Sequence, residues 1–470
     1  MGPIACFVEG GRLGEKSGYA FCLSGLLFLS LGSLRWLFSP DQKLGIREAI
    51  ISVLSIWLLS CIGGALPLYF GGMFDHFIDS LFEATSALTT TGSTVLPISY
   101  PLDCPRSLIY WRFLMSGIGG MGIVLLFIVF LPALGAHGRL LFRYEATGPN
   151  FTPIYPTVRQ SAMAFLFLYI GACLACCLTL HIVHPSISIF ESTALAFSTI
   201  STSGFVPIDG GIAAYHSQSI ETVLMIFMII GGGSFALYFD LLRGRFKRIF
   251  DPEFLAYIAI IICLCVFSSF LLLHTSIPNE MAVYSPWQSL RYSSFNLISS
   301  LTSTGFTLQN YDYWPQSLLM LMFIAMYFGG MSGSTAGGIK IIRLQMLWEC
   351  LKHSVHTLFD PDRIRVMRIG GVEIPQATIF GVLSFFLVVV VSAVVGIIIL
   401  LVSGVDWITA TGLSGAMLNN AGITFGAAGA SSTCADLPIT AKIVSIIWML
   451  LGRLEYYLWL TLLLPSFWRR

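Results

Sequence analysis

Four short turns of similar composition recur along this chain and constrain its fold more than any other feature. Each follows a half-apolar run that is too short to cross a bilayer. Each contains a glycine: Gly92 in FEATSALTTTGSTV, Gly204 in ALAFSTISTSGF, Gly305 in LISSLTSTGFT and Gly422 in GAMLNNAGITFG. The glycines are 112, 101 and 117 residues apart. Four occurrences at so regular a period indicate one structural unit used four times.

Apolar runs of membrane-spanning length surround the turns. The chain is 56% hydrophobic and only 10% charged, whereas about a quarter of the residues of a soluble domain are charged. A helix of about 20 residues crosses a bilayer. Runs of that length or more occupy residues 18–38, 49–70, 107–131, 160–183, 217–242, 254–274, 316–349, 377–402 and 438–464. We therefore predict an integral membrane protein without a separate soluble domain.

The segment before each turn is shorter than a span, at about 15 residues. It must enter and leave the membrane on one face, and irregular backbone at that depth is tolerated only where it is buried or lines a watery cavity. The expected fold class is an all-α integral membrane protein with four helix–pore-loop–helix repeats in a pseudo-fourfold arrangement around a central cation pore. An extra N-terminal transmembrane region occupies 1–44, and the repeats occupy 45–135, 136–242, 243–350 and 351–470.

Lys and Arg gather in the connectors between the repeats, which sets the orientation. They are Lys43, Arg47, Arg139, Arg143, Arg159, Arg243, Arg245, Lys247, Arg248, Lys352, Arg363, Arg365, Arg368, Arg469 and Arg470. Because positive residues mark the cytoplasmic face, the turns enter from outside. A single helix before the first repeat would then leave Met1 outside. We therefore expect the N-terminal region to be truncated, with GPIACFV as the end of an earlier helix.

The turns have the chemistry of a cation filter. A cation that crosses a bilayer loses its water, and backbone carbonyls from several turns around one axis can replace the lost oxygens. A glycine in each turn can take positive φ and so direct successive carbonyls inward. The short helix before each turn also points its partly negative C-terminal end at the axis, which favours a cation.

A second glycine-rich stretch interrupts the run 316–349. It reads GGMSGSTAGG, with five glycines in ten residues, each of which costs a helix roughly 1 kcal/mol relative to alanine. We predict an intramembrane loop below the filter that acts as its gate; the alternative is a kink used only for helix packing. The predicted gate residues are Gly329, Gly330, Ser332, Gly333, Ser334, Thr335, Gly337, Gly338 and Lys340.

The repeats and several longer motifs resemble those of bacterial potassium-uptake proteins of the TrkH and TrkG type, within the Trk/Ktr/HKT superfamily. The motifs are FEATSALTTTGSTV, RYEATGPNFTPIYPTVRQ, TSTGFTLQNYDYWP, FGGMSGSTAGGIKIIR, LNNAGITFG and GRLEYYLWLTLLLPSFWRR. The resemblance covers nearly the whole chain from about Gly45 onward. It implies potassium passage across a bacterial inner membrane, a homodimer in membrane lipid, and control by a peripheral cytosolic subunit that binds nucleotides, similar to TrkA.

The resemblance also implies which residues bind the potassium ion, and it implies no organic cofactor. Carried over by position, the filter residues are Thr90, Thr91, Gly92, Thr202, Ser203, Gly204, Ser303, Thr304, Gly305, Asn420, Ala421 and Gly422. In plant relatives a serine at the first filter glycine accompanies sodium transport, so Gly92 favours potassium. The second turn reads TSGF, where the family pattern is more apolar and richer in glycine.

Charged residues inside apolar runs cost about 2.5–3.5 kcal/mol each on insertion scales, so each needs a role. The resemblance implies that Arg453 faces the pore below the filter and opposes ion passage when the gate is shut. The alternative is a structural pairing of Arg453 with Glu455 or with carbonyls. Arg112 is a second such cation. Glu83 and Glu191, in the first two short helices, are expected to hold the filter scaffold by hydrogen bonds.

Other function classes fit the sequence less well. A membrane-embedded enzyme would need His, Asp or Glu converging on one cavity, and the spans hold only scattered ones. A net charge of +1 gives no indication of nucleic-acid binding. Secondary transporters of organic solutes usually have inverted repeats, whereas these repeats run in one sense. A potassium/proton or sodium-coupled symporter with the same filter remains an alternative. Cys104 and Cys434 lie in outer loops that a fourfold ring makes neighbours, so a disulfide between them is a further hypothesis.

Overall fold

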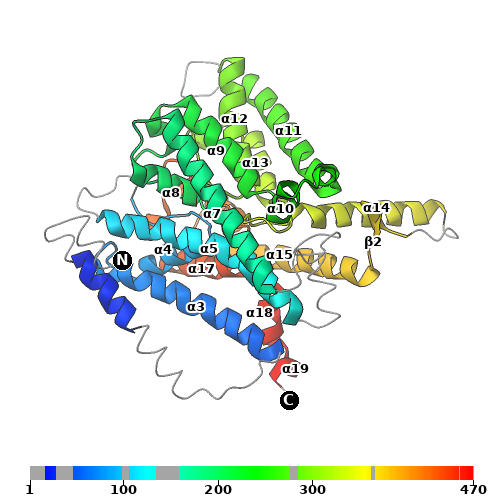
Figure 1. The fold of residues 1–470 in the computed structure, drawn as a ribbon, viewed down its shortest axis with the longest axis horizontal. Helices are drawn as coiled ribbons and strands as arrows, with labels where there is room; N and C mark the ends of the chain where they lie inside the picture. Colours follow the sequence, from blue (N-terminus) through cyan, green and yellow to red (C-terminus); the bar gives the residue numbers. More distant parts are fainter. Residues whose placement is uncertain are drawn as a thin grey trace.

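The computed structural model is almost entirely helical (Figure 1). It describes residues 16–27, 46–97, 105–133, 158–275, 284–360, 366–454 and 456–468. Within these ranges four helices are long and apolar enough to cross a membrane, or six spans if each of two bent helix pairs counts as one. The described part of the chain thus has the helices of a multi-pass membrane protein.

The elements follow one another in a repeating order. A helix over residues 16–27 comes first. The next are α3 (Ile46–Phe70), α4 (Phe77–Leu88), α5 (Arg106–Ala133), α7 (Val158–Val183), α8 (Ile189–Ile200), η1 (Ile212–Tyr215), α9 (Gln218–Gly231), α10 (Phe235–Leu242) and η2 (Phe246–Phe250). Then come α11 (Pro252–Leu273), α12 (Pro286–Leu301), η3 (Tyr311–Tyr313), α13 (Gln316–Phe328) and α14 (Ile341–Phe359). A hairpin of β1 (Arg368–Ile369) and β2 (Val372–Glu373), which the sequence did not predict, leads to the last helices. These are α15 (Gln376–Val402), α16 (Trp407–Leu418), η4 (Gly426–Ala428), η5 (Cys434–Asp436), α17 (Ile439–Arg453), α18 (Tyr456–Leu463) and α19 (Pro465–Trp468).

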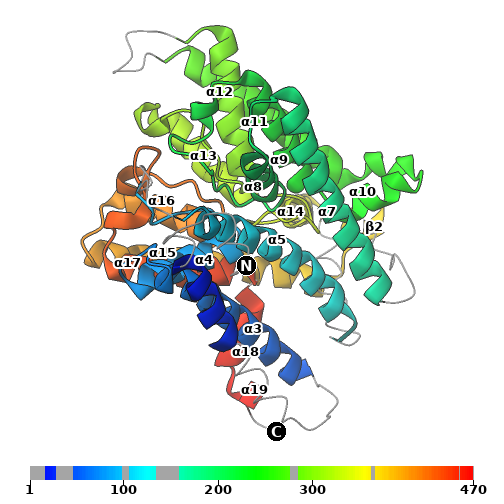
Figure 2. The same ribbon diagram turned by 60° about the vertical axis from the view of Figure 1, so that its left-hand side comes forward.

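The short helices α4, α8, α12 and α16 each pack between longer helices of their own stretch of chain. Their neighbours are α3 and α5, α7 and α9, α11 and α13, and α15 and α17 respectively. Each short helix also contacts the preceding stretch: α8 contacts α5, α12 contacts α9, and α16 contacts α13. Helix α4 contacts α17 near the end of the chain. The first and last stretches are therefore neighbours, as Figure 2 shows for α4, α15, α16 and α17.

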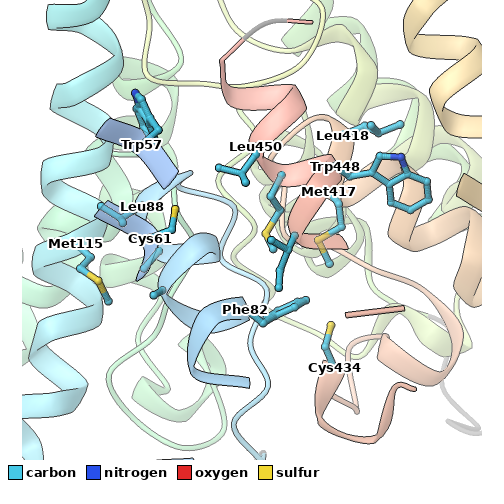
Figure 3. Packing of buried hydrophobic residues seen from close by; sticks show 14 of the residues in the cluster. Trp57, Cys61, Phe82, Leu88, Met115, Met417, Leu418, Cys434, Trp448 and Leu450 are labelled. Atoms are coloured by element: carbon cyan, nitrogen blue, oxygen red, sulfur yellow. The ribbon is translucent and has the colours of Figure 1, made fainter. Parts of the chain in front are cut away.

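Two large hydrophobic clusters hold these helices together. One gathers the buried faces of α7 to α13, and the other joins α3, α4 and α5 to α15, α16 and α17. In the second cluster, Cys61, Phe82 and Met115 share one buried region with Met417 and Leu450 (Figure 3). Because apolar side chains pack closely in such a region, the short helices are held in position on several sides at once.

Two spans that the apolar pattern predicts as continuous are bent or broken in the structure. The run 217–242 divides into α9 and α10, whose axes differ by 95°. The prediction of one continuous span there was wrong, because the successive glycines 231–233 interrupt the helix. The run 438–464 likewise divides, into α17 and α18. The run 316–349 divides into α13 and α14 at the predicted glycine-rich break.

Some expectations fall on residues outside the described ranges. The structure describes the N-terminal helix over 16–27, but residues 1–15, on which the expected truncation depends, lie outside. Cys104, the suggested disulfide partner of the buried Cys434, also lies outside the described ranges. The same is true of Glu455, one suggested partner of Arg453.

Candidate cation pathway

Each of the four short helices ends in a turn of the same conformation. In every turn the second residue after the helix has positive φ although it is not glycine: Thr90 (53°), Thr202 (58°), Ser303 (52°) and Asn420 (50°). The glycine two residues later also has positive φ: Gly92 (84°), Gly204 (74°), Gly305 (91°) and Gly422 (68°). The expected positive φ of the four glycines is confirmed, whereas the positive φ of the four polar residues was not predicted.

Two backbone hydrogen bonds close each turn in the pattern of a Schellman motif. In the first turn, the N–H of Thr91 donates to the carbonyl of Ser86 at 2.8 Å and that of Thr90 to the carbonyl of Ala87 at 3.1 Å. The longer-range bond recurs from Ser203 to Ser198, from Thr304 to Ser299 and from Ala421 to Ala416, at 2.8, 2.9 and 2.8 Å. A left-handed conformation costs a non-glycine residue roughly 1–2 kcal/mol, so the surrounding structure must hold each turn in place.

The glycines mark the points at which neighbouring turns touch. In each turn, a Cβ on the glycine would meet the carbonyl oxygen of the residue that precedes the glycine of the next turn. The pairs are Gly92 with Ser203, Gly204 with Thr304, Gly305 with Ala421, and Gly422 with Thr91. The Cβ on Gly305 would lie 2.8 Å from its oxygen, and the other three would collide outright. Because these contacts are with backbone, no side chain can move to make room, and the four turns form a closed ring.

Polar side chains behind the ring bond to one another. The hydroxyl oxygens of Thr89 and Thr91 lie 2.8 Å apart. In the third turn those of Thr302 and Thr304 have the same separation. Asn420 joins the fourth turn to the first, since its Nδ2 donates to Thr91 Oγ1 at 3.0 Å and to the carbonyl of Met449 at 3.0 Å. These hydrogen bonds therefore help to hold the turns in place.

Three backbone carbonyl oxygens of the ring accept no hydrogen bond from the described residues. Among the hydrogen bonds of the described residues, none has the carbonyl oxygen of Thr91, Ser203 or Thr304 as acceptor. All three residues are fully buried. Since a buried carbonyl normally has a partner, these oxygens are suited to coordinate a cation.

A buried ion pair supports the segment that follows the first turn. Arg112 Nη2 lies 2.5 Å from Glu83 Oε1, and both side chains are almost inaccessible. Glu83 Oε2 accepts the N–H of Val95 at 2.9 Å, and the Thr94 hydroxyl donates to Glu83 Oε1 at 2.9 Å. The Arg112 guanidinium also lies 4.3 Å from the centre of the Phe205 ring. The expectation that Glu83 holds the scaffold by hydrogen bonds is confirmed.

Asn296, which sequence reasoning missed, supports the third turn in the way Glu83 supports the first. Its Oδ1 accepts the N–H of Leu308 at 3.2 Å. Asn296 and Glu83 precede the glycines of their turns by the same number of residues, and this spacing could have identified Asn296. Glu191 lies further from its turn, and its carboxylate instead accepts the N–H of Ser188 in a capping box at the start of α8. Glu191 therefore makes its hydrogen bond at the start of the short helix α8, and not beside the turn as Glu83 does.

The glycine-rich stretch is a buried loop over 329–340 that contacts three other parts of the chain. It contains all of the predicted gate residues, of which Gly329, Gly333 and Gly338 have φ of 65°, 73° and 74°. The N–H of Met331 donates to the carbonyl of Gly232 at 2.8 Å, within the break between α9 and α10. Thr335 Oγ1 donates to the carbonyl of Ile200 at 2.8 Å. The break is thus a docked loop and not a kink within one helix.

The same loop lies directly against the ring of turns. The N–H of Gly337 donates to Ser303 Oγ at 2.7 Å, and a Cβ on Gly337 would collide with the carbonyl oxygen of Asn419. At the end of the loop, Lys340 Nζ donates to the carbonyl of Ala336 at 2.7 Å. The loop therefore touches the turns through the Ser303 side chain and through the backbone of Asn419.

Arg453 is buried at the end of α17 and joins the loop to α5. Its Nη1 donates to the carbonyl of Thr335 at 2.8 Å and its Nη2 to the carbonyl of Gly119 at 3.1 Å. Pairing with carbonyls, one of the two expected arrangements, is confirmed. Arg453 thereby places a cation beside the loop.

Comparisons with known proteins show similarity over nearly the whole chain. The family model TrkH, described as a cation transport protein, matches residues 17–468. The chain is 31% identical to the Trk system potassium uptake protein TrkH of Salmonella typhimurium, over 97% of this chain and 93% of that protein. It is 32% identical to the protein of the same name from Halomonas elongata, over 94% and 91%.

A solved structure matches as well. The crystal structure of the potassium transporter TrkH from Vibrio parahaemolyticus aligns with a TM-score of 0.86 and 28% identity, and the match covers 100% of this chain and 95% of that one. The matched family consists of cation transporters and not of enzymes. The chain therefore belongs to the TrkH family of cation transport proteins.

Proposed function

We propose that this protein takes up potassium across the bacterial inner membrane through a filter of backbone carbonyls. The observation that carries the proposal is the closed ring in which each glycine touches the carbonyl before the next glycine. Relatives at 31% and 32% identity that are named potassium uptake proteins support potassium as the ion. The four stretches of chain would then be four repeats in pseudo-fourfold arrangement around one pore.

The filter residues that we assign are those of the ring and their immediate neighbours. They are Thr90, Thr91 and Gly92; Thr202, Ser203 and Gly204; Ser303, Thr304 and Gly305; and Asn420, Ala421 and Gly422. A dehydrated cation is stabilised by carbonyl oxygens from several turns at once. The partly negative C-terminal ends of α4, α8, α12 and α16 add to this stabilisation, because each of these helices ends at the ring.

The loop over 329–340 is the gate in this proposal. Its support is the contact with Ser303 and Asn419 at the inner end of the ring. Arg453 supplies a fixed positive charge beside the closed loop, which repels an approaching potassium ion. Opening would move the loop and free Thr335 from the Arg453 guanidinium.

The assembly is a homodimer in the lipid bilayer, controlled by a cytosolic nucleotide-binding subunit similar to TrkA. The support is the family itself, whose members are named as parts of a Trk system. By the positive-inside rule, the basic residues of the η2 connector, Arg245, Lys247 and Arg248, would lie on the cytoplasmic face, from which such a subunit would approach. The chain binds potassium ions in this proposal and no organic cofactor.

Ion flux into liposomes that contain the purified protein tests the filter. The expected result is potassium flux that follows its electrochemical gradient, exceeds sodium flux and moves no protons, as reported by a proton-sensitive dye. Proton movement in fixed ratio to potassium would favour the alternative, a symporter with the same filter. Equal potassium and sodium flux would overturn a potassium-selective filter. Empty liposomes control for leak.

Replacement of Arg453 by Gln tests the barrier. Removing the charge while keeping two N–H donors should raise basal potassium flux, because the cation that repels the ion is gone. Lower flux together with a lower yield of folded protein would indicate that Arg453 is only a strut. Arg245→Gln, which removes an exposed charge far along the connector, is the matched control.

A further inference from the structure

One hydrogen bond links the loop, which is the proposed gate, to the third turn, which is part of the proposed filter. Gly337 donates its N–H to Ser303 Oγ at 2.7 Å. Ser303 is fully buried and has a φ of 52°, so the residue that accepts this bond is itself in a strained conformation. Its neighbour Thr304 supplies the carbonyl oxygen that meets Gly204 of the adjacent second turn. A shift of Ser303 therefore displaces a ring carbonyl.

The loop is packed tightly against the backbone of its neighbours. A Cβ on Gly337 would collide with the carbonyl oxygen of Asn419, which lies in the fourth turn. A Cβ on Gly330, at the other end of the loop, would come within 2.5 Å of the carbonyl oxygen of Gly232. Since both ends of the loop rest on backbone atoms, movement of the loop is transmitted to the ring instead of being absorbed by side chains.

A buried carboxylate holds the loop from the side away from the ring. Glu253 Oε1 accepts the N–H of Ser332 at 2.6 Å, and the two residues are 5% and 1% exposed. Glu253 lies in the first turn of α11, whose capping residue Asp251 pairs with Arg248 at 3.0 Å. Arg248 also pairs with Asp240 at 3.0 Å. A continuous set of polar contacts thus runs from the basic connector to the loop.

We propose that Ser303 is a specificity-determining residue through which the loop sets the geometry of the filter, and that Glu253 is a positioning residue that holds the loop against Ser303. Ion selectivity then depends on where the loop lies, and not on the ring alone. This inference rests on the proposed function, because it takes the ring as the filter and the loop as its gate.

The test is a double-substitution cycle with the potassium-to-sodium flux ratio in liposomes as the readout. Ser303→Ala removes the acceptor for Gly337, and Glu253→Met removes the acceptor for Ser332 with little change of volume. Ser303→Ala should lower the ratio by about fivefold, the factor that corresponds to one neutral hydrogen bond of about 1 kcal/mol. Glu253→Met should lower it by at most the same factor, because its effect reaches the ring through Ser303. The double variant should lower it no further than Ser303→Ala does, because the loop is already uncoupled from the ring.

Conservative variants and controls separate this role from a merely structural one. Ser303→Thr and Glu253→Gln keep an acceptor and should restore the ratio; threonine already occupies the equivalent positions 90 and 202. Ser300→Ala is the matched control on α12, since the Ser300 hydroxyl donates to the carbonyl of Asn296 within the helix. Glu48→Gln is the control for the loss of a carboxylate, at an exposed position.

The possible outcomes distinguish failure of the proposed coupling from failure of the proposed function. If Glu253→Met and Ser303→Ala change potassium and sodium flux by the same factor, the loop is a gate without influence on selectivity, and the coupling is overturned while the proposed function stands. If the unmodified protein shows no potassium preference, the proposed function itself fails. If Ser303→Ala does not fold, the ratio measured for Glu253→Met against Glu253→Gln still supports or overturns the coupling.

Discussion

Thr90, Thr202, Ser303 and Asn420 adopt a backbone conformation in which glycine would cost less, and at two of these four positions a side-chain contact explains the choice. Ser303 Oγ accepts a hydrogen bond from the loop, and Asn420 Nδ2 bridges the fourth and first turns. Glycine could provide neither contact. The true glycines lie two residues further on, where a neighbouring carbonyl excludes any Cβ. The polar residue at these two positions is thus explained by a side-chain contact, and the glycine by the close approach of a neighbouring carbonyl.

At this scale, Gly92→Ala should abolish most potassium flux. The new methyl group would collide with the carbonyl oxygen of Ser203, and alanine at a φ of 84° adds a cost of about 1–2 kcal/mol. Flux in liposomes and the thermal unfolding midpoint in detergent measure the two effects. Gly171→Ala on α7 is the control, because a Cβ there meets no atom within 4 Å and should leave both unchanged.

Arg112→Met should destabilise the protein strongly. It leaves the Glu83 carboxylate buried without its cation, and breaking a buried pair in this way costs about 3–5 kcal/mol. The unfolding midpoint measures the loss, and Glu83→Gln in the same chain should restore part of it. Arg245→Gln removes an exposed partner of Asp240 and should cost at most about 1 kcal/mol. Equal effects of Arg112→Met and Arg245→Gln would contradict this account.

At the scale of secondary-structure elements, the places where long helices break matter as much to the fold as the helices themselves. The loop over 329–340 was predictable because five glycines in ten residues cannot continue a helix at low cost. The bend between α9 and α10 was not predicted, although three glycines occur in succession there. The difference is tertiary: the carbonyl of Gly232 gains a partner in Met331, which only the folded chain reveals.

Gly233→Ala should disturb this bend. A Cβ at Gly233 would collide with the Tyr238 hydroxyl oxygen, and overpacking of this kind typically costs about 1–3 kcal/mol. We expect a lower unfolding midpoint and altered potassium flux, since the loop rests on the bend. Gly122→Ala on α5, where the nearest atom to a new Cβ is 3.8 Å away, should change neither. An unchanged midpoint for Gly233→Ala would mean that the bend tolerates a side chain.

Over the whole molecule, the sequence was most informative where a pattern repeats. The short runs before each glycine predicted α4, α8, α12 and α16, and apolar length predicted most of the long helices. Contacts between distant residues could not be predicted, because one sequence does not show which side chains meet. The Glu83–Arg112 pair and the Glu253 contact with the loop are of this kind.

The outer surface also belongs to this scale. Helix α15 is apolar on all sides, and many of its side chains are exposed, including Leu387, Val391 and Ile398. Val391→Arg should therefore reduce membrane insertion, because an arginine near the centre of a span costs about 2.5–3.5 kcal/mol. The membrane-bound fraction of expressed protein measures this. Val402→Arg, at the helix end and 84% exposed, should be tolerated; equal insertion of both variants would show that α15 does not face lipid.

The ring of turns closes only through its most distant parts, and this has a consequence for biosynthesis. Gly422 rests on the carbonyl of Thr91, Asn420 donates to Thr91, and Lys442 Nζ lies 2.6 Å from Asp79 Oδ1. The contacts of the first turn are therefore complete only after the ribosome has added more than three hundred further residues, which include its partners. A nascent chain released before α16 emerges would carry three turns and an open side, a form that quality-control proteases can recognise before any ion is conducted.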